Sequence, residues 1–107
     1  MNLLFICSRN QWRSPTAEKI FSNQFHDTRS AGTEPSARIK ITEKLINWAD
    51  LIFVMEKKHK QRLTEKFGAI LKDKKLIVLD ILDEYQYMDE ELIENLKNSV
   101  SPYLKNR

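Results

Sequence analysis

Residues 3–15 read Leu3-Leu4-Phe5-Ile6-Cys7-Ser8-Arg9-Asn10-Gln11-Trp12-Arg13-Ser14-Pro15. The four apolar residues predict a short buried strand, and the run that follows Pro15, residues 16–21, predicts a helix. Cys7 therefore lies where a strand ends and shortly before a helix begins. At such a junction backbone N–H groups point toward an anion, and the positive end of the helix favours a thiolate.

Arg13 follows Cys7 in the same loop and offers a planar fork for a phosphate-like group. A lone cysteine is more often a small buried hydrophobe, and Ser14-Pro15 alone is a common way to start a helix. Neither reading explains the arginine at this spacing, so we expect an anion site. The candidate binding residues of the loop are Ser8, Arg9, Asn10, Gln11 and Trp12.

Composition narrows the class of protein. The chain has 107 residues, of which 41% are hydrophobic and 31% charged, and this predicts one domain spanning residues 1–107. A single cysteine excludes an internal disulfide and fits a reducing compartment. The first apolar run is broken by Arg9 and no run reaches membrane-spanning length, so we expect a cytoplasmic protein without a membrane role. The net charge of +3 suits an acidic partner but equally suits solubility.

Apolar runs at residues 3–6, 51–55 and 76–79 predict buried strands, and residues 28–31 predict a weaker fourth. Helix-period segments separate them; the first places Phe25 on its apolar face, the third has a break at Gly68, and the last begins at Asp89. Strands that alternate with helices predict an α/β domain with three layers, in which a parallel sheet has helices on both faces.

Ligands of such sheets bind beyond the carboxyl ends of the strands. Both the loop after Ile6 and the segment after Leu79 leave the sheet at that edge. The second segment is acidic and aromatic; it contains Asp80, Asp83, Glu84, Tyr85 and Tyr87. Tyr85, Tyr87 and Trp12 could wall a pocket for an aryl group, although packing or surface roles are nearly as frequent.

These residues would suffice for phosphate ester hydrolysis. Cys7 would attack phosphorus, loop amides and Arg13 would hold the oxygens, and an acid would protonate the leaving oxygen. Ser14 could donate its hydroxyl to the thiolate. Asn10 tolerates a left-handed backbone, and Ser30 could support its side chain, although ordinary turn chemistry explains both residues equally well.

We expect no cofactor and no metal, because no ligand cluster has metal spacing. The two histidines, His26 and His59, lie in polar stretches of the sequence, and we expect no chemical role for them.

The pattern Cys-x5-Arg-Ser-Pro after an N-terminal strand resembles the low-molecular-weight protein tyrosine phosphatases. Three more stretches agree in order: residues 30–33 with the family's second strand, residues 49–56 with its third strand and exit, and residues 81–85 with its acid loop. The resemblance covers nearly the whole chain. It implies the phosphotyrosine protein phosphatase I-like fold with a four-stranded parallel sheet, no cofactor, and hydrolysis of phosphotyrosine through phosphocysteine.

By position in these motifs, the resemblance implies a role for each of several residues. Cys7 is the nucleophile, Arg13 the phosphate clamp, Ser14 the thiolate donor and Asp83 the general acid. Asn10 and Ser30 match the pair that stabilises the loop. Asp80, at a strand end, and Asp89, as a helix cap, compete with Asp83 for the acid role.

The sequence departs from the family pattern at several positions. Arg9 stands where glycine is usual, Trp12 replaces a common second cysteine, and Glu84 replaces the proline after the acid. The stretch between Thr33 and Ala49 is short, so part of the usual pocket wall is missing. These changes leave the reaction type intact and the substrate open.

The sequence therefore predicts a cysteine-dependent phosphomonoesterase, most simply a tyrosine phosphatase. Its partners would be a phosphotyrosine protein or a small aryl phosphate, with inorganic phosphate or sulfate able to occupy the loop and nucleic acid not expected. Two alternatives stay open. One is a catalytically weak module that binds a phosphoprotein or an RNA end, and the other is an arsenate reductase that uses external thiols.

Overall fold

The computed structural model describes residues 1–104 and contains one sheet of four parallel strands in the order β2-β1-β3-β4. The strands are β1 (Asn2–Cys7), β2 (Asp27–Gly32), β3 (Leu51–Val54) and β4 (Lys75–Val78). The helices are α1 (Arg13–Phe21), α2 (Glu43–Trp48), α3 (Lys57–Leu71) and α4 (Glu90–Leu104). The predicted α/β class, with a four-stranded parallel sheet, is confirmed.

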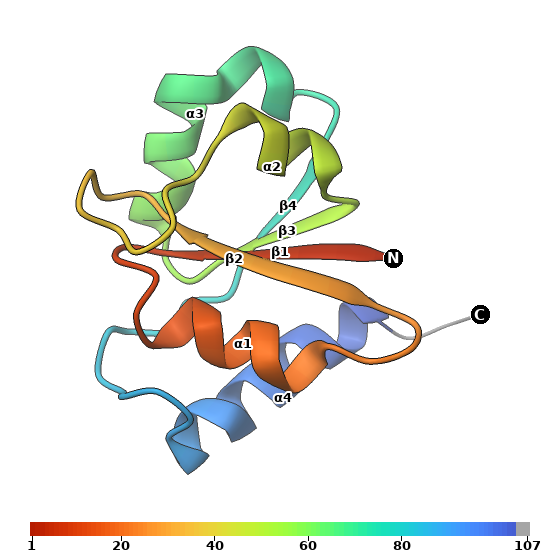
Figure 1. Ribbon diagram of the computed structural model, residues 1–107, viewed down its shortest axis with the longest axis vertical. Helices are drawn as coiled ribbons and strands as arrows, with labels where there is room; N and C mark the ends of the chain where they lie inside the picture. Colours follow the sequence, from red (N-terminus) through yellow and green to blue (C-terminus); the bar gives the residue numbers. More distant parts are fainter. Residues whose placement is uncertain (105–107) are drawn as a thin grey trace.

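Helices cover both faces of the sheet, α1 and α4 on one and α2 and α3 on the other (Figure 1). Successive residues of the central strand β1 point to opposite faces, as the period of a strand requires. Leu3 and Phe5 pack with the α1–α4 layer, and Leu4 and Ile6 with the α2–α3 layer. Both faces are therefore buried, which explains why the strands appear as continuous apolar runs in the sequence.

The first helix is shorter than the sequence predicts. It ends at Phe21, and Phe25, which was expected on its apolar face, is 67% exposed. The reason lies in Asn23, whose side-chain oxygen accepts hydrogen bonds from the backbone N–H groups of Phe25 and His26 at 2.7 and 3.0 Å. Such an Asx turn replaces a further helical turn and leads the chain into β2.

The third and fourth helices mostly follow the prediction. The expected break at Gly68 lies one residue earlier, where Phe67 has a φ of −128° and kinks α3; beyond the kink the helix continues to Leu71. The start of α4 is confirmed: the Asp89 carboxylate accepts the backbone N–H of Glu91 at 2.9 Å, as a helix cap should.

The carboxyl ends of all four strands lie at one edge of the sheet, because the strands are parallel. At this edge, on the left of Figure 1, lie the loop after β1 and the chain that leaves β4. Residues 7–13 are called the cysteine loop below, and residues 79–89 the acid segment. No helix among residues 1–104 has the length and apolar character needed to cross a membrane.

Candidate active site

The cysteine loop is held from outside by the segment that follows β2. Four of its carbonyl oxygens accept hydrogen bonds of 2.9–3.0 Å: Cys7 from Thr33 N, Ser8 from Glu34 N, Arg9 from Arg38 N and Asn10 from Arg38 Nε. The N–H of a trans peptide points opposite to its C=O. The amides of residues 8–11 are therefore turned to the inside of the loop, where they form a bowl of donors.

Two residues allow this tight curvature. Asn10 has φ of 58°, in the left-handed region that asparagine tolerates, and its amide donates to Cys7 Sγ at 3.2 Å. Gly32 lies directly behind the loop. A Cβ atom there would come within 2.5 Å of the Ser8 carbonyl oxygen and 2.6 Å of the Ala37 side chain, so only glycine fits without movement.

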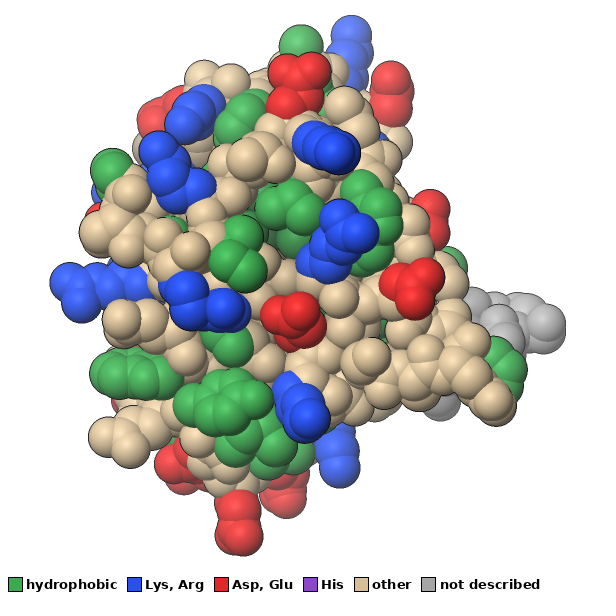
Figure 2. Space-filling view, viewed as in Figure 1, with side chains coloured by type: hydrophobic (Ala, Val, Ile, Leu, Met, Phe, Trp, Pro, Cys, Tyr) green, Lys and Arg blue, Asp and Glu red, His purple; other side chains and the backbone are tan. Residues whose placement is uncertain are grey.

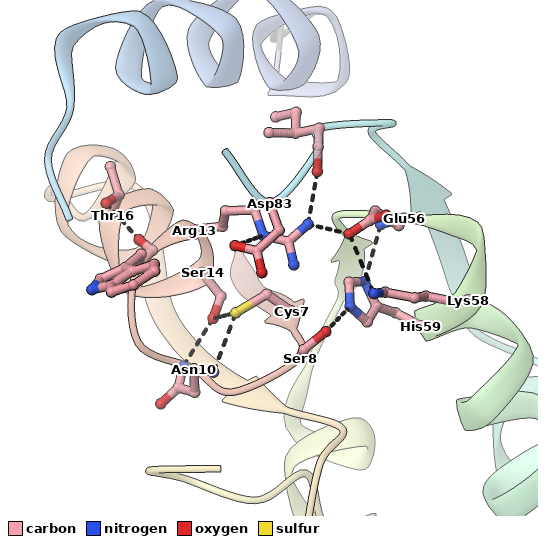
Figure 3. Close-up of polar contacts among 12 residues, drawn as sticks. Cys7, Ser8, Asn10, Arg13, Ser14, Thr16, Glu56, Lys58, His59 and Asp83 are labelled. Atoms are coloured by element: carbon pink, nitrogen blue, oxygen red, sulfur yellow. Dashed lines mark hydrogen bonds and ion pairs between the residues drawn. The ribbon is translucent and has the colours of Figure 1, made fainter. Parts of the chain in front are cut away.

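A chain of hydrogen bonds reaches the sulfur from the side of α1 (Figure 3). The Asn10 side-chain amide donates to Ser14 Oγ at 2.9 Å and to Ser30 Oγ at 2.8 Å, and Ser30 Oγ donates to Glu18 at 2.5 Å. Ser14 Oγ lies 3.0 Å from Cys7 Sγ. Asn10 already donates to Ser14, and the other acceptor near the Ser14 hydroxyl, the Ala31 carbonyl, lies 3.4 Å away, so the hydroxyl proton is directed to the nearer sulfur.

Arg13 is almost completely buried, with 1% of its surface exposed. Its Nη1 donates to Glu56 Oε2 at 2.5 Å and to the Ile81 carbonyl at 2.8 Å. Its Nε is buried and has no hydrogen-bond partner among the described residues. Arg13 also lines the cavity above Cys7, so one edge of the guanidinium is fixed by the protein and the other remains available for a ligand.

Glu56 was not predicted as a site residue, yet it provides the counter-charge of Arg13. Partial burial raises the pKa of Glu56, but the hydrogen bond and charge of Arg13, together with Lys58 and His59, outweigh that effect and hold it below the usual value. The signal in the sequence was its position: Glu56 follows the buried strand run at the edge where Arg13 is expected.

His59 was expected to have no chemical role, and its placement contradicts the polar surroundings assumed for it. It is 1% exposed, and its Nε2 lies 2.9 Å from Ser8 Oγ, inside the site. The reason is the start of α3, where Glu56 and His59 form a capping box that turns the imidazole inward. The three-residue spacing of this box was visible in the sequence.

Asp83 stands opposite the sulfur, across a cavity of about 390 Å³. Its Oδ1 lies 3.7 Å from Arg13 Nε, and 56% of its side chain is exposed. The cavity is lined by Cys7, Ser8, Arg9, Gln11, Trp12, Arg13, Glu34, Lys58 and Asp83. The cysteine loop and the acid segment thus meet at one site, as their position at the sheet edge predicted.

The two competing aspartates lie outside this cavity. Asp80 lines a different hollow, beside Leu79 and Tyr85, and Asp89 caps α4. Asp83 is the only aspartate among residues 1–104 that lines the cavity above Cys7.

No family model matches the chain. It is 29% identical to the protein-arginine-phosphatase of Bacillus subtilis (strain 168), in a match that covers 64% of this chain and 64% of that protein's length. The chain therefore matches less than two thirds of that curated relative.

Solved structures agree over nearly the full length. A cysteine-to-serine mutant of the YwlE arginine phosphatase, with its active-site serine phosphorylated, superimposes with a TM-score of 0.77 at 25% identity, over 100% of this chain and 98% of that one. The tyrosine phosphatase Wzb from Escherichia coli K30, in complex with phosphate, gives 0.75 at 21% identity, over 95% and 94%. The predicted resemblance to the low-molecular-weight protein tyrosine phosphatases is confirmed.

Two exposed side chains, Arg9 and Trp12, form the rim of the cavity. Trp12, which stands where the family commonly has a second cysteine, is 43% exposed and lines the cavity. Arg9 also lines the cavity, and both side chains stand at its mouth rather than filling it. The bowl therefore stays open despite the missing glycine.

The expected tyrosine wall is not found at this cavity. The Tyr85 hydroxyl turns to α4, where it donates to Glu91 at 3.2 Å and accepts from Asn95 at 3.0 Å. Tyr87 lines a neighbouring hollow of about 690 Å³ between α1, β2 and Arg38. Among residues 1–104, the aromatic residue that lines the cavity above Cys7 is Trp12.

No three His, Cys, Asp or Glu side chains of residues 1–104 are arranged to hold a metal ion. Lys and Arg side chains alternate with Asp and Glu on the face shown in Figure 2. The positive net charge is thus dispersed on that face rather than gathered into one basic surface.

Proposed function

We propose that this protein is a cysteine-dependent phosphatase that removes a phosphoryl group from a modified protein side chain. The observation that carries the proposal is the arrangement of the bowl. Inward-facing amides, the free edge of Arg13 and the Cys7 sulfur converge on one cavity that fits a phosphoryl group.

In the first step Cys7 Sγ attacks phosphorus and forms a sulfur–phosphorus bond, while the bond from phosphorus to the leaving atom breaks. Asp83, within reach across the cavity, gives its proton to the leaving atom. The amides and Arg13 stabilise the charge on the equatorial oxygens.

In the second step the Asp83 carboxylate takes a proton from water, and the water oxygen attacks phosphorus. The sulfur–phosphorus bond breaks, and inorganic phosphate leaves. The departing thiolate accepts a hydrogen bond from the Ser14 hydroxyl, which Asn10 orients toward it. This contact makes the thiolate a better leaving group.

The proposed substrate is phosphotyrosine in a protein, with Trp12 at the mouth as a stacking surface for the ring. Phosphoarginine is the second candidate, because similar proteins from Bacillus subtilis and Geobacillus stearothermophilus are named arginine phosphatases. The charge at the mouth of the cavity also favours phosphoarginine: the carboxylates of Asp83 and Glu34 line the cavity and could pair with a guanidinium leaving group.

The experiment compares hydrolysis of two peptides of identical sequence, one with phosphotyrosine and one with phosphoarginine, together with a simple aryl phosphate. The matched control is Cys7→Ser, which should lose turnover by a factor on the order of 10⁴ or more and still bind phosphate. Full activity of Cys7→Ser would refute the mechanism. Phosphate binding without turnover in the unaltered protein would favour the binding-module alternative.

A further inference from the structure

His59 makes two contacts that together determine where its ring carries a proton. Its Nδ1 accepts the backbone N–H of Glu56 at 3.0 Å, and its Nε2 lies 2.9 Å from Ser8 Oγ. A backbone N–H can only donate, so Nδ1 has no hydrogen. The neutral ring therefore carries its proton on Nε2.

The surroundings keep the ring neutral. Burial lowers the pKa of His59, and the charges of Arg13, Lys58 and Arg62 lower it further, to about 4, against the opposing effect of Glu56. At neutral pH the Nε2–H group therefore donates to the Ser8 oxygen. The direction of this hydrogen bond follows from the geometry at Nδ1 and does not depend on the value of the pKa.

The consequence falls on Ser8. Its oxygen accepts from His59, so its own proton must point elsewhere, and the hydroxyl makes no other hydrogen bond among residues 1–104. Ser8 lines the cavity beside Cys7 and Arg13. Its hydroxyl is therefore a donor without an acceptor at the wall of an anion site.

We propose that His59 is a positioning residue that makes the Ser8 hydroxyl an additional donor to the phosphoryl group. This rests on the proposed function of the same bowl. The opposite wall has the same arrangement: the Asn10 side chain donates to the Ser14 oxygen, and the Ser14 proton is directed to the Cys7 sulfur. Figure 3 shows the two pairs on either side of Cys7, Asn10 with Ser14 and His59 with Ser8. On each wall, a buried donor turns a serine hydroxyl inward.

Two substitutions separate the two contacts of His59. In His59→Asn, the side-chain oxygen can replace Nδ1 as the acceptor for Glu56 N–H, but the side chain is too short to reach Ser8. In His59→Gln, the side-chain nitrogen can replace Nε2 as the donor to Ser8, while the contact with Glu56 is lost. One variant thus keeps the helix cap, and the other keeps the serine contact.

The measurement is the dissociation constant for inorganic phosphate, by titration calorimetry, with the melting temperature of each variant alongside. Ser8→Ala and His59→Asn should each weaken phosphate binding about tenfold, the usual effect of losing a hydrogen bond to a charged group. The double variant should be no weaker than either single variant. His59→Gln should bind phosphate within about twofold of the unaltered protein, although its melting temperature falls through loss of the cap.

Unchanged binding in His59→Asn, additive losses in the double variant, or a loss in His59→Gln equal to that in His59→Asn would overturn the proposal. A second measurement needs no substitution at the site. The ¹⁵N shifts of the imidazole at neutral pH should show His59 neutral with hydrogen on Nε2, the resonances being assigned with His26→Gln. A charged ring or hydrogen on Nδ1 would also overturn it.

These readouts are independent of turnover. If the unaltered protein binds phosphate and the variants behave as stated, the role of His59 stands even if no phosphatase activity is found. If the unaltered protein binds no phosphate at all, the proposed function fails first, and the tautomer measurement alone then decides whether His59 presents Ser8 as a donor.

Discussion

The cysteine loop and the acid segment meet at one cavity but are held in different ways. Hydrogen bonds fix four consecutive carbonyls of the loop, and Asn10, Arg13 and Ser14 are buried. In the acid segment, Ile81 and Met88 are anchored through backbone hydrogen bonds, while the residues between 82 and 84 are exposed. The anion-binding half is thus built into the fold, and the proton donor lies on a surface segment. Binding and proton transfer should therefore be separable by mutation.

Arg13→Lys should impair both phosphate binding and turnover, because Arg13 contacts the bowl and the acid segment. A lysine cannot keep the contacts to Glu56 and the Ile81 carbonyl while also presenting a second edge to phosphate. We expect kcat/KM for an aryl phosphate to fall by about 10²–10⁴, as for loss of transition-state donors. Phosphate affinity should fall as well, and a variant with unchanged affinity would contradict the proposed clamp.

Asp83→Asn should affect proton transfer and leave the bowl intact. The expected fall in kcat is about 10²–10³ for a poor leaving group, and smaller for an activated aryl phosphate that needs no acid. Because Asp83 is 56% exposed, the free energy of unfolding should stay within about 0.5 kcal/mol of the unaltered protein. Equal losses with good and poor leaving groups would exclude Asp83 as the acid. Asp80→Asn is the matched control and should change neither quantity.

Gly32→Ala tests the loop from behind. The added Cβ meets the Ser8 carbonyl and Ala37, so the loop or the segment behind it must move. We expect a loss of about 1–3 kcal/mol in the free energy of unfolding, typical of overpacking, together with weaker phosphate binding. Chemical denaturation measures the first quantity. Gly68→Ala, where a Cβ meets nothing within 4 Å, is the matched control and should not destabilise the protein.

Protonation of His59 makes the stability of the folded protein depend on pH. Its pKa is about 4 in the folded protein, against an ordinary 6.5, and the groups around it are Arg13, Glu56, Lys58 and Arg62. Between these two values the unfolded chain binds the proton and the folded protein does not, so stability falls as pH falls from about 6.5 to about 4.

For His59 alone the loss is about 2 kcal/mol between pH 7.5 and pH 5. Urea denaturation across that range should show it, and His59→Gln should have a correspondingly flatter profile. An identical slope in both proteins would mean that the imidazole is not held neutral by the fold.

The sequence predicted the cysteine loop and the sheet edge well, and for a physical reason. Buried parallel strands leave continuous apolar runs, and the tight spacing of Cys7 and Arg13 confines both to one loop. What it missed depended on contacts between distant segments. Glu56 and His59 come from the start of α3, and only the pairing of β3 with β1 brings them to Arg13 and Ser8.

In the acid segment, the sequence predicted contacts with the cavity that the structure does not have. Its tyrosines were expected at the cavity because they follow the strand that ends beside it. Their direction depended on α4, since Tyr85 finds polar partners in Glu91 and Asn95. Exposed segments without regular structure carry few local signals of side-chain direction.

The central claim is that the Cys7 sulfur, the loop amides and the free edge of Arg13 surround one oxyanion. A crystal structure of the unaltered protein with inorganic phosphate tests it most directly. We predict phosphorus about 3.5 Å from Cys7 Sγ, with its oxygens bonded to the amides of residues 8, 9 and 11 and to Arg13, because the Asn10 amide donates to the sulfur. An empty bowl at saturating phosphate, or phosphate bound only elsewhere on the surface, would contradict the account.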